Sequence, residues 1–149
     1  MKLMEVKVSR VVAAKPAAVF DVWVDPANPG SPWNAGVRRI VNFAVDGLYY
    51  WEVNHEGRKW AHYGRFVRIE RPGLVEYTWM SEATKGLESV VTVRFEPLGE
   101  ETEVTLVHSG VPDDDMGRGH EGGWTWFLGN LADRFAVHED CLLYTSRCV

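Results

Sequence analysis

The sequence contains little cysteine and no long apolar segment. Its two cysteines, Cys141 and Cys148, both lie in the last nine residues of the 149-residue chain, so the residues before them offer neither a disulfide nor thiol chemistry. No apolar run is long enough to cross a membrane, and the first ten residues lack the hydrophobic centre of a signal peptide. We therefore expect a cytoplasmic protein.

Basic clusters and the common motifs for metals and nucleotides are also missing. The formal net charge is −5, with no run of Lys or Arg that would follow a phosphate backbone, which argues against nucleic acid as a partner. No His/Cys pair has zinc spacing, no Ser lies in a nucleophile elbow, and no glycine motif suits a phosphate. We interpret the acidic run 113–115, near His120, as a helix cap in preference to a metal site. We expect no metal and no cofactor.

The last nine residues differ abruptly in composition from the segment before them. The codons tgt ctc tta tac aca tct can encode residues 141–146, and they resemble a transposon-end adapter used in preparing DNA for sequencing. The reverse complement of that run begins with codons for Arg147, Cys148 and Val149, followed by a stop. We therefore predict one natural domain over residues 1–140 and an adapter-encoded tail over residues 141–149.

What the sequence does contain is a strongly amphipathic segment near its end. In residues 122–135, Trp124, Leu128, Leu131 and Phe135 recur at helical spacing and form one apolar stripe. Such a stripe needs a broad apolar partner. The segments before it have the pattern of strands, so we expect one antiparallel sheet that packs against this long helix. Glycines at the start and in the middle of the helix suggest that space is left beneath it.

The rest of the chain reads as strands separated by turn signals, after one short helix. Lys15 and Pro16 begin this helix, which ends at Asp25 and Pro26. A loop or one short helical turn follows, in which Trp33 is expected to plug one end of the sheet. Alternation of polar and apolar residues predicts seven strands. These strands span residues 5–12, 37–43, 48–54, 59–70, 74–80, 89–96 and 103–109.

Four sequence segments in this order resemble a known family. They are VFDVWVDP at 19–26, GRFVRIERPGLVEYTW at 64–79, TEVTLVHSG at 102–110 and GWTWFLGNL at 123–131. Together they are similar to the family named for the activator of heat-shock-protein-90 ATPase homologue, in the START-like (SRPBCC) superfamily. The resemblance implies an α+β helix-grip fold in which a seven-stranded antiparallel sheet wraps around a long C-terminal helix. It implies a cavity more firmly than it implies a reaction.

Seven tryptophans and five tyrosines make this chain rich in aromatic side chains. Alternation places Tyr77 and Trp79 on the inward face of one strand, and Leu106 and His108 on that of another. We expect these walls to enclose a cavity that holds a flat apolar or amphipathic molecule, as small-molecule pockets do when they exceed a few hundred Å³. The expected ligand-binding residues are Trp51, His62, Tyr63, Tyr77, Trp79, Leu106, His108, Trp124, Phe127 and Leu128.

Two other functions stay open at this stage. A cyclase, dehydratase or hydrolase acting on a polyketide-like carbonyl compound would use His62, Tyr63 or His108 in proton transfer. A co-chaperone-like interaction module would need an exposed apolar patch, for which Trp126 is the candidate. The leading prediction is a small-molecule binder with no assigned catalytic residue. A homodimer is left open, and neither nucleic acid nor a membrane is expected as a partner.

Overall fold

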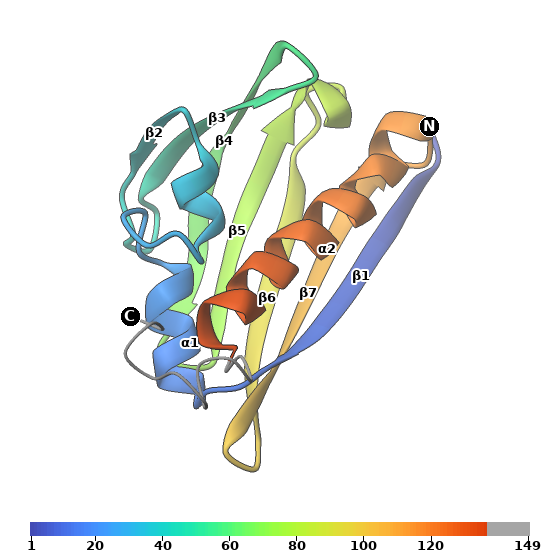
Figure 1. The fold of residues 1–149 in the computed structure, drawn as a ribbon. Coiled ribbons are helices and arrows are strands. Elements are labelled where there is room, and N and C mark those ends of the chain that lie inside the picture. The colour runs from blue at the N-terminus through green and yellow to red at the C-terminus, as the bar shows by residue number, and fades with distance from the viewer. Residues whose placement is uncertain (137–149) are drawn as a thin grey trace.

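A computed structural model describes residues 1–136 as an antiparallel sheet of seven strands that curves around one long helix (Figure 1). The expected helix-grip architecture is therefore confirmed. The elements, in chain order, are β1 (Leu3–Val12), α1 (Pro16–Trp23), η1 (Pro32–Ala35), β2 (Arg38–Val41), β3 (Leu48–His55), β4 (Arg58–Glu70), β5 (Leu74–Ser81), η2 (Glu82–Thr84), β6 (Ser89–Leu98), β7 (Glu101–Pro112) and α2 (Asp115–Phe135).

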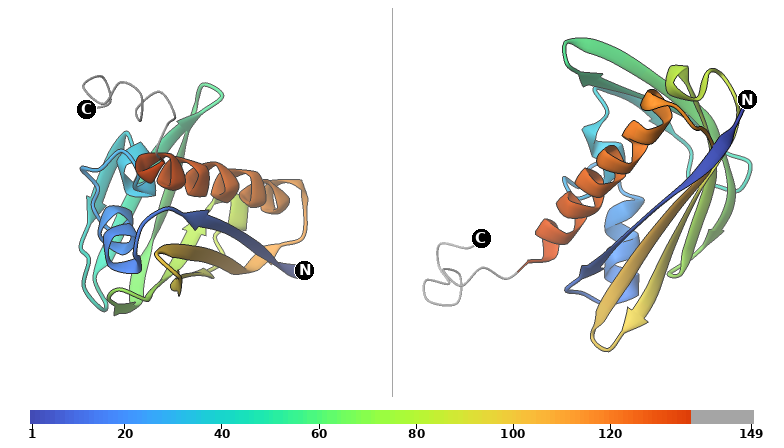
Figure 2. Two further views of the ribbon diagram at one scale, coloured as in Figure 1. Left: turned by 60° about the horizontal axis from the view of Figure 1, so that its bottom comes forward. Right: turned by 90° about the vertical axis from the view of Figure 1, so that its right-hand side faces the viewer.

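Strands β2 to β7 form a meander in chain order, and β1 pairs with β7 at one edge of the sheet. Its strand order is β1-β7-β6-β5-β4-β3-β2, and every neighbouring pair is antiparallel. Figure 2 shows α2 lying along the concave side of this sheet, with α1 and η1 beside the end of α2. The concave side of β3 to β7 and the inner face of α2 therefore enclose the space in which any internal site must lie.

Period-two alternation decides which side chains enter that space. The strand residues expected to point inward are all buried, because one face of each strand packs against the helices. These inward residues are Tyr49, Trp51, Val75, Tyr77, Trp79, Val91, Val93, Phe95, Val104, Leu106 and His108. On α2, Trp124, Leu128 and Leu131 are buried and Phe135 is half-buried, as the helical stripe predicted.

The long helix begins seven residues before its predicted start. The Asp114 carboxylate accepts a hydrogen bond from Gly117 N (2.8 Å), so the acidic run does serve as the expected helix cap. Gly117 is needed there, because a Cβ atom at this position would overlap the carbonyl oxygen of Pro112. The glycines between this cap and Trp124 made the first two turns resemble a loop. A good cap outweighs their low helix propensity.

Other boundaries differ by a few residues. β2 is shorter than expected, and β7 continues to Pro112, so only Asp113 and Asp114 separate it from α2. No helix within residues 1–136 has the length and apolar character needed to span a membrane. The predicted domain end at Asp140 and the proposed tail over residues 141–149 lie outside the described residues.

Candidate functional site

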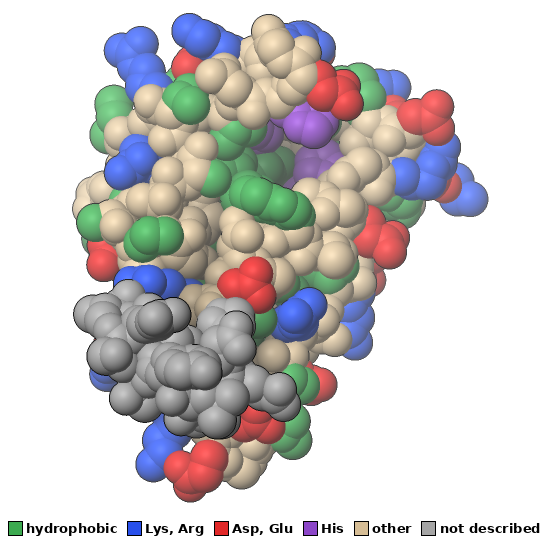
Figure 3. Space-filling model, in the orientation of Figure 1, with side chains coloured by type: hydrophobic (Ala, Val, Ile, Leu, Met, Phe, Trp, Pro, Cys, Tyr) green, Lys and Arg blue, Asp and Glu red, His purple; other side chains and the backbone are tan. Residues whose placement is uncertain are grey.

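The inward aromatic side chains leave a small hollow between α2 and the sheet. Figure 3 shows a recess on the surface of the molecule, with hydrophobic side chains at its floor and histidine side chains on its wall. The hollow is too narrow to admit even a water molecule, whereas common ligand pockets measure roughly 300 to 1,000 Å³. Aromatic rings therefore fill the space in which a cavity was expected. The hollow is lined by Pro32, Trp33, Trp51, Tyr77, Trp79 and Trp124.

The polar atoms of this lining are mainly hydrogen-bond donors without partners. The indole N–H groups of Trp33, Trp51 and Trp79 are buried and find no acceptor among residues 1–136. Burial raises the pKa of Tyr77, so its side chain remains a neutral phenol. A buried donor that is left unpaired costs about 1 to 3 kcal/mol. Trp23 and Trp60, which do not line the hollow, also have buried indole N–H groups without an acceptor among residues 1–136, so this feature is not confined to the hollow.

His108 lies behind Trp79 and is part of a closed chain of hydrogen bonds. Its Nδ1 accepts from Trp124 Nε1 (3.1 Å), and its Nε2 lies 2.7 Å from Ser89 Oγ. An indole nitrogen only donates, so the neutral imidazole carries its proton on Nε2. Ser89 Oγ in turn donates to the carbonyl oxygen of Trp79 (2.7 Å). Both ring nitrogens are therefore engaged within the protein.

This arrangement corrects the role expected for His108. The side chain is fully buried, and burial is the main cause that lowers its pKa to about 2. A neutral imidazole with both nitrogens bonded has no atom left to orient a ligand or to accept a proton. His108 instead ties Trp124 on α2 to Ser89 on β6, and so fixes the helix against the sheet.

His62 has a different pattern of bonds. Its ring lies 4.5 Å from the ring of Trp79, centroid to centroid, and its Nδ1 lies 3.2 Å from the carbonyl oxygen of Trp51. A carbonyl only accepts, so Nδ1 carries the proton and Nε2 keeps its lone pair. Burial lowers the pKa of His62 to about 4, so this ring is neutral at pH 7.

His120 on α2 repeats the bonding of His62. Its Nδ1 lies 2.9 Å from the carbonyl oxygen of Gly117, which again leaves the lone pair on Nε2. Its ring lies 6.4 Å from that of Trp79 and 4.8 Å from that of His108. The side chain is largely enclosed, and burial lowers its pKa. His62 and His120 are thus two neutral acceptors placed against the same tryptophan.

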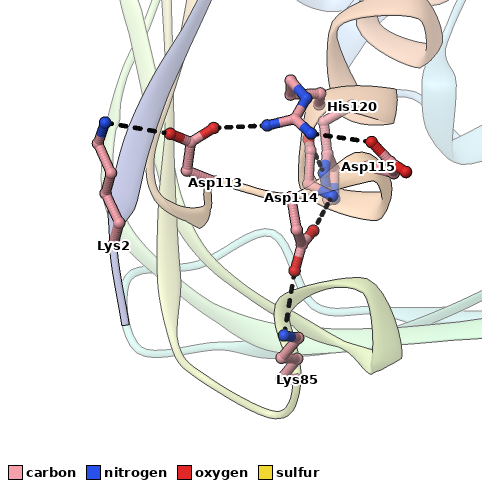
Figure 4. A network of polar contacts seen from close by, with 8 residues as sticks. Lys2, Lys85, Asp113, Asp114, Asp115 and His120 are labelled. Carbon is pink, nitrogen blue, oxygen red and sulfur yellow. Dashed lines mark hydrogen bonds and ion pairs between the residues drawn. The ribbon is translucent and has the colours of Figure 1, made fainter.

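Charged residues join the segment that follows β5 to the segment between β7 and α2 (Figure 4). Asp114, the cap of α2, lies 3.1 Å from Lys85 Nζ in the loop after η2. Arg118 bonds to Asp113 (2.7 Å) and to Asp115 (2.8 Å). The segments after β5 and after β7 are therefore tied to each other.

Several expected site residues lie elsewhere. Tyr63 points to the opposite face of β4, where it is 46% exposed and lines a separate shallow groove, so it cannot form a pair with His62 in the hollow. Leu106 and Leu128 are buried in the core but do not line the hollow. Phe127 is half-buried, with its ring 5.6 Å from that of Trp51. Of the ten expected residues, Trp51, Tyr77, Trp79 and Trp124 line the hollow.

Sequence reasoning missed the roles of Trp33 and His120, and it misplaced Gly129. Trp33 was expected to plug the sheet, and its ring indeed packs 4.9 Å from that of Tyr49, but it also lines the hollow. His120 was considered only as a neighbour of the acidic run. Gly129 was expected to leave room beneath α2, yet a Cβ atom there would meet no atom within 4 Å, so it faces away from the packed interior.

Comparison with known protein families gives a match over most of the chain. A family model described as "Activator of Hsp90 ATPase homolog 1-like protein" matches residues 13–136. No match was found among curated proteins.

Solved structures with a similar fold come from several organisms. Protein CV1439 from Chromobacterium violaceum is 22% identical, with a TM-score of 0.72, and the match covers 90% of this chain and 98% of that one. Mll3558 from Rhizobium loti is 19% identical, with a TM-score of 0.74 and coverage of 89% and 96%. An HSP90 activator from Plasmodium falciparum is 22% identical, with a TM-score of 0.70 and coverage of 86% and 93%. At these identities the likeness concerns the fold alone.

Proposed function

Because this chain belongs to the Activator of Hsp90 ATPase homolog 1-like family, we propose that it binds a flat apolar or amphipathic small molecule between α2 and the sheet. The observation that carries this proposal is the aromatic lining of the hollow, to which Trp33, Trp51 and Trp79 contribute indole rings whose N–H groups have no acceptor among residues 1–136. Aromatic faces favour a flat ligand, and the indole N–H groups would bond to an acceptor atom on it. The expected cytoplasmic location and a homodimer stay predictions.

Binding requires the hollow to widen, because at present it has no room even for a water molecule and so none for a ligand with two fused rings. Two features would permit this. The first half of α2 contains Gly119, Gly122 and Gly123, which lower its helix propensity. Phe127 at the edge of the hollow is only half-buried. Movement of Phe127 and of the first turns of α2 would open a path to Trp51 and Trp79.

Two alternatives can be separated from ligand binding by experiment. An enzyme acting on a carbonyl compound would use the Nε2 lone pair of His62, because His108 has both ring nitrogens engaged. It would show turnover that is lost in His62→Phe. An interaction module would use Trp126, whose side chain is 60% exposed, and it would lose partner binding in Trp126→Ala without any change in ligand affinity.

Isothermal titration calorimetry with tetralin and α-tetralone tests the proposal. These probes share a two-ring skeleton, and only the ketone has an acceptor oxygen. We expect both to bind, with the ketone bound about 3- to 10-fold more tightly, in keeping with one net hydrogen bond. Trp51→Phe should reduce this preference, whereas Trp126→Phe, which changes an indole on the exposed face of α2, should not. Absence of binding by either probe would refute the proposal.

A further inference from the structure

A groove beside the start of β4 lies apart from the hollow. It measures about 350 Å³, which is within the roughly 300 to 1,000 Å³ of common ligand pockets. Its lining comes from residues 59–61 and Tyr63 of β4, and from Ser81, Glu82 and Gly86 at and after the end of β5. Successive side chains of a strand point to opposite faces of the sheet. Because three consecutive residues of β4 line the groove, it runs along the edge of that strand.

This groove occupies the place in which β5 would continue beside β4. On one side, β3 pairs with β4 from Arg58 onward. On the other side, pairing with β5 begins only at His62, opposite Ser81. The chain then leaves the sheet as η2, and Figure 1 shows the hairpin of β3 and β4 extending past the end of β5. Among residues 1–136, the segment 58–61 therefore has a neighbouring strand on one side only and forms a short free edge.

The backbone groups of Lys59 and Ala61 point away from β3, towards the groove. Further along β4, the backbone N–H of Arg65 donates to Thr78 Oγ1 on β5 (3.0 Å). Backbone groups point alternately to one neighbouring strand and to the other, so every second residue before Arg65 shares its direction. The register of β4 with β3 has no shift over residues 58–65. Within residues 1–136, neither Lys59 nor Ala61 makes a backbone hydrogen bond across the groove.

The charges around the groove favour an acidic occupant. Arg58 lies over the ring of Trp60, 4.1 Å from its centroid, and forms an ion pair with Glu82, so these two charges offset each other. Lys59 is exposed and belongs to none of the ion pairs within residues 1–136. A carboxylate complements its charge. The other free edge, β2 of a second copy, would bring two arginines, residues 38–39, next to it, and like charges on paired strands repel.

We propose that the free edge of β4 binds an extended acidic segment of a partner protein, which adds to the sheet as an antiparallel strand where β5 ends. Its backbone pairs with the N–H and C=O groups of Lys59 and Ala61, as the unpaired groups of an edge strand allow. A carboxylate of the segment lies opposite Lys59. Ala61 is small and Tyr63 is 46% exposed, so a larger apolar side chain opposite Ala61 packs on the phenol ring.

Three blocked hexapeptides with the same side chains test this edge. The parent alternates valine and threonine around one glutamate. The second carries N-methyl groups on the glutamate amide and on the amide two residues before it, which face β4 when glutamate lies opposite Lys59. The third carries them on the two intervening amides, which face away. In heteronuclear NMR titrations, we expect the parent and the third peptide to move the backbone N–H signals of Lys59 and Ala61, and the second to bind at least about 10-fold more weakly.

A charge reversal tests the expected acidic character. Lys59→Glu should weaken binding of the parent peptide about 3- to 10-fold and strengthen binding of the analogue in which lysine replaces glutamate. Lys7→Glu is the matched control, because Lys7 is also exposed but lies on β1 at the opposite edge of the sheet. This control should leave both affinities unchanged.

Four results in the unaltered protein would overturn the proposal. The Lys59 and Ala61 signals could stay in place at millimolar parent peptide, or the second peptide could bind as tightly as the third. Sodium acetate could move these signals as far as the peptide does, which would make the groove a site for small carboxylates. The signals could also move with protein concentration alone, which would make a second copy the occupant. None of these measurements involves the hollow, so their outcome leaves the proposed small-molecule binding to its own test.

Discussion

His108 and His62 are uncharged because the protein encloses them, and this couples folding to pH. Their pKa values lie at about 2 and about 4 in the folded protein, against about 6.5 for an unperturbed imidazole. Between pH 6.5 and pH 4 the unfolded chain therefore binds protons that the folded protein does not. Stability consequently rises with pH across this interval and is lost as the pH falls.

We predict that the free energy of unfolding is nearly constant above pH 7 and drops below pH 6.5. Each fully depressed histidine contributes about 1.4 kcal/mol per pH unit. Urea titrations between pH 7.5 and pH 4.5 measure this slope above the range in which most carboxylates titrate. In His62→Asn the slope should fall by about one proton. A stability that stays flat down to pH 5, or a slope that His62→Asn leaves unchanged, would show that these imidazoles are not held neutral.

At the same scale, alternation identified which side chains point inward but not what they bond to. Tyr77, Trp79 and His108 were predicted to point inward from the period of two alone, and they are buried. The engagement of both nitrogens of His108 depends on Trp124, which lies 16 residues away, and on Ser89, 19 residues away. Such partners follow from strand register and helix placement, which no local pattern contains. The free lone pair of His120 was missed for the same reason.

At the scale of elements, α2 combines a required glycine with several that are not required. A Cβ atom at Gly117 would overlap the Pro112 carbonyl oxygen, whereas Gly119, Gly122 and Gly123 have open space around the same position. Glycine costs about 1 kcal/mol relative to alanine in a helix interior. The first half of α2 is therefore less stable than its stripe of buried residues requires.

We predict opposite effects for two glycine-to-alanine substitutions in this helix. Gly123→Ala should stabilise the protein by about 0.5 to 1 kcal/mol, because it raises helix propensity without a new contact. Gly117→Ala should lower the melting temperature, because the start of α2 must shift away from Pro112. Thermal unfolding followed by circular dichroism compares the two. If Gly123→Ala lowers the melting temperature, the helix does not have the described course at this position.

The same glycines explain why the start of α2 could not be predicted while its end could. Trp124 to Phe135 carries a strong apolar period, which marks a helix in any context. Before Trp124 the residues of α2 are polar or glycine apart from Met116, and only the cap by Asp114 and the close approach of Gly117 to Pro112 identify them as helical. Both of these are contacts at the turn between β7 and α2, which depend on how the chain reverses there.

At the scale of the whole molecule, the packing of the sheet around α2 was predictable. How tightly side chains fill the space between them was not. The order of elements and the inward faces follow from periodicity and from resemblance to a family. The volume of the hollow depends on how the rings of Trp33, Trp51, Tyr77, Trp79 and Trp124 lean together in three dimensions. Trp33 enters this cluster from η1, where no periodic pattern indicates which way a side chain points.

The central claim is that the indole donors around the hollow receive the ligand. The most direct test follows the indole N–H resonances of all seven tryptophans by heteronuclear NMR during titration with α-tetralone. We predict that the signals of Trp33, Trp51 and Trp79 shift together and saturate, because these residues line the hollow and their indole N–H groups have no acceptor among residues 1–136. The signal of Trp126, on the exposed face of α2, should stay in place. Movement of Trp126 alone, or of no indole signal at saturating ligand, would contradict the account.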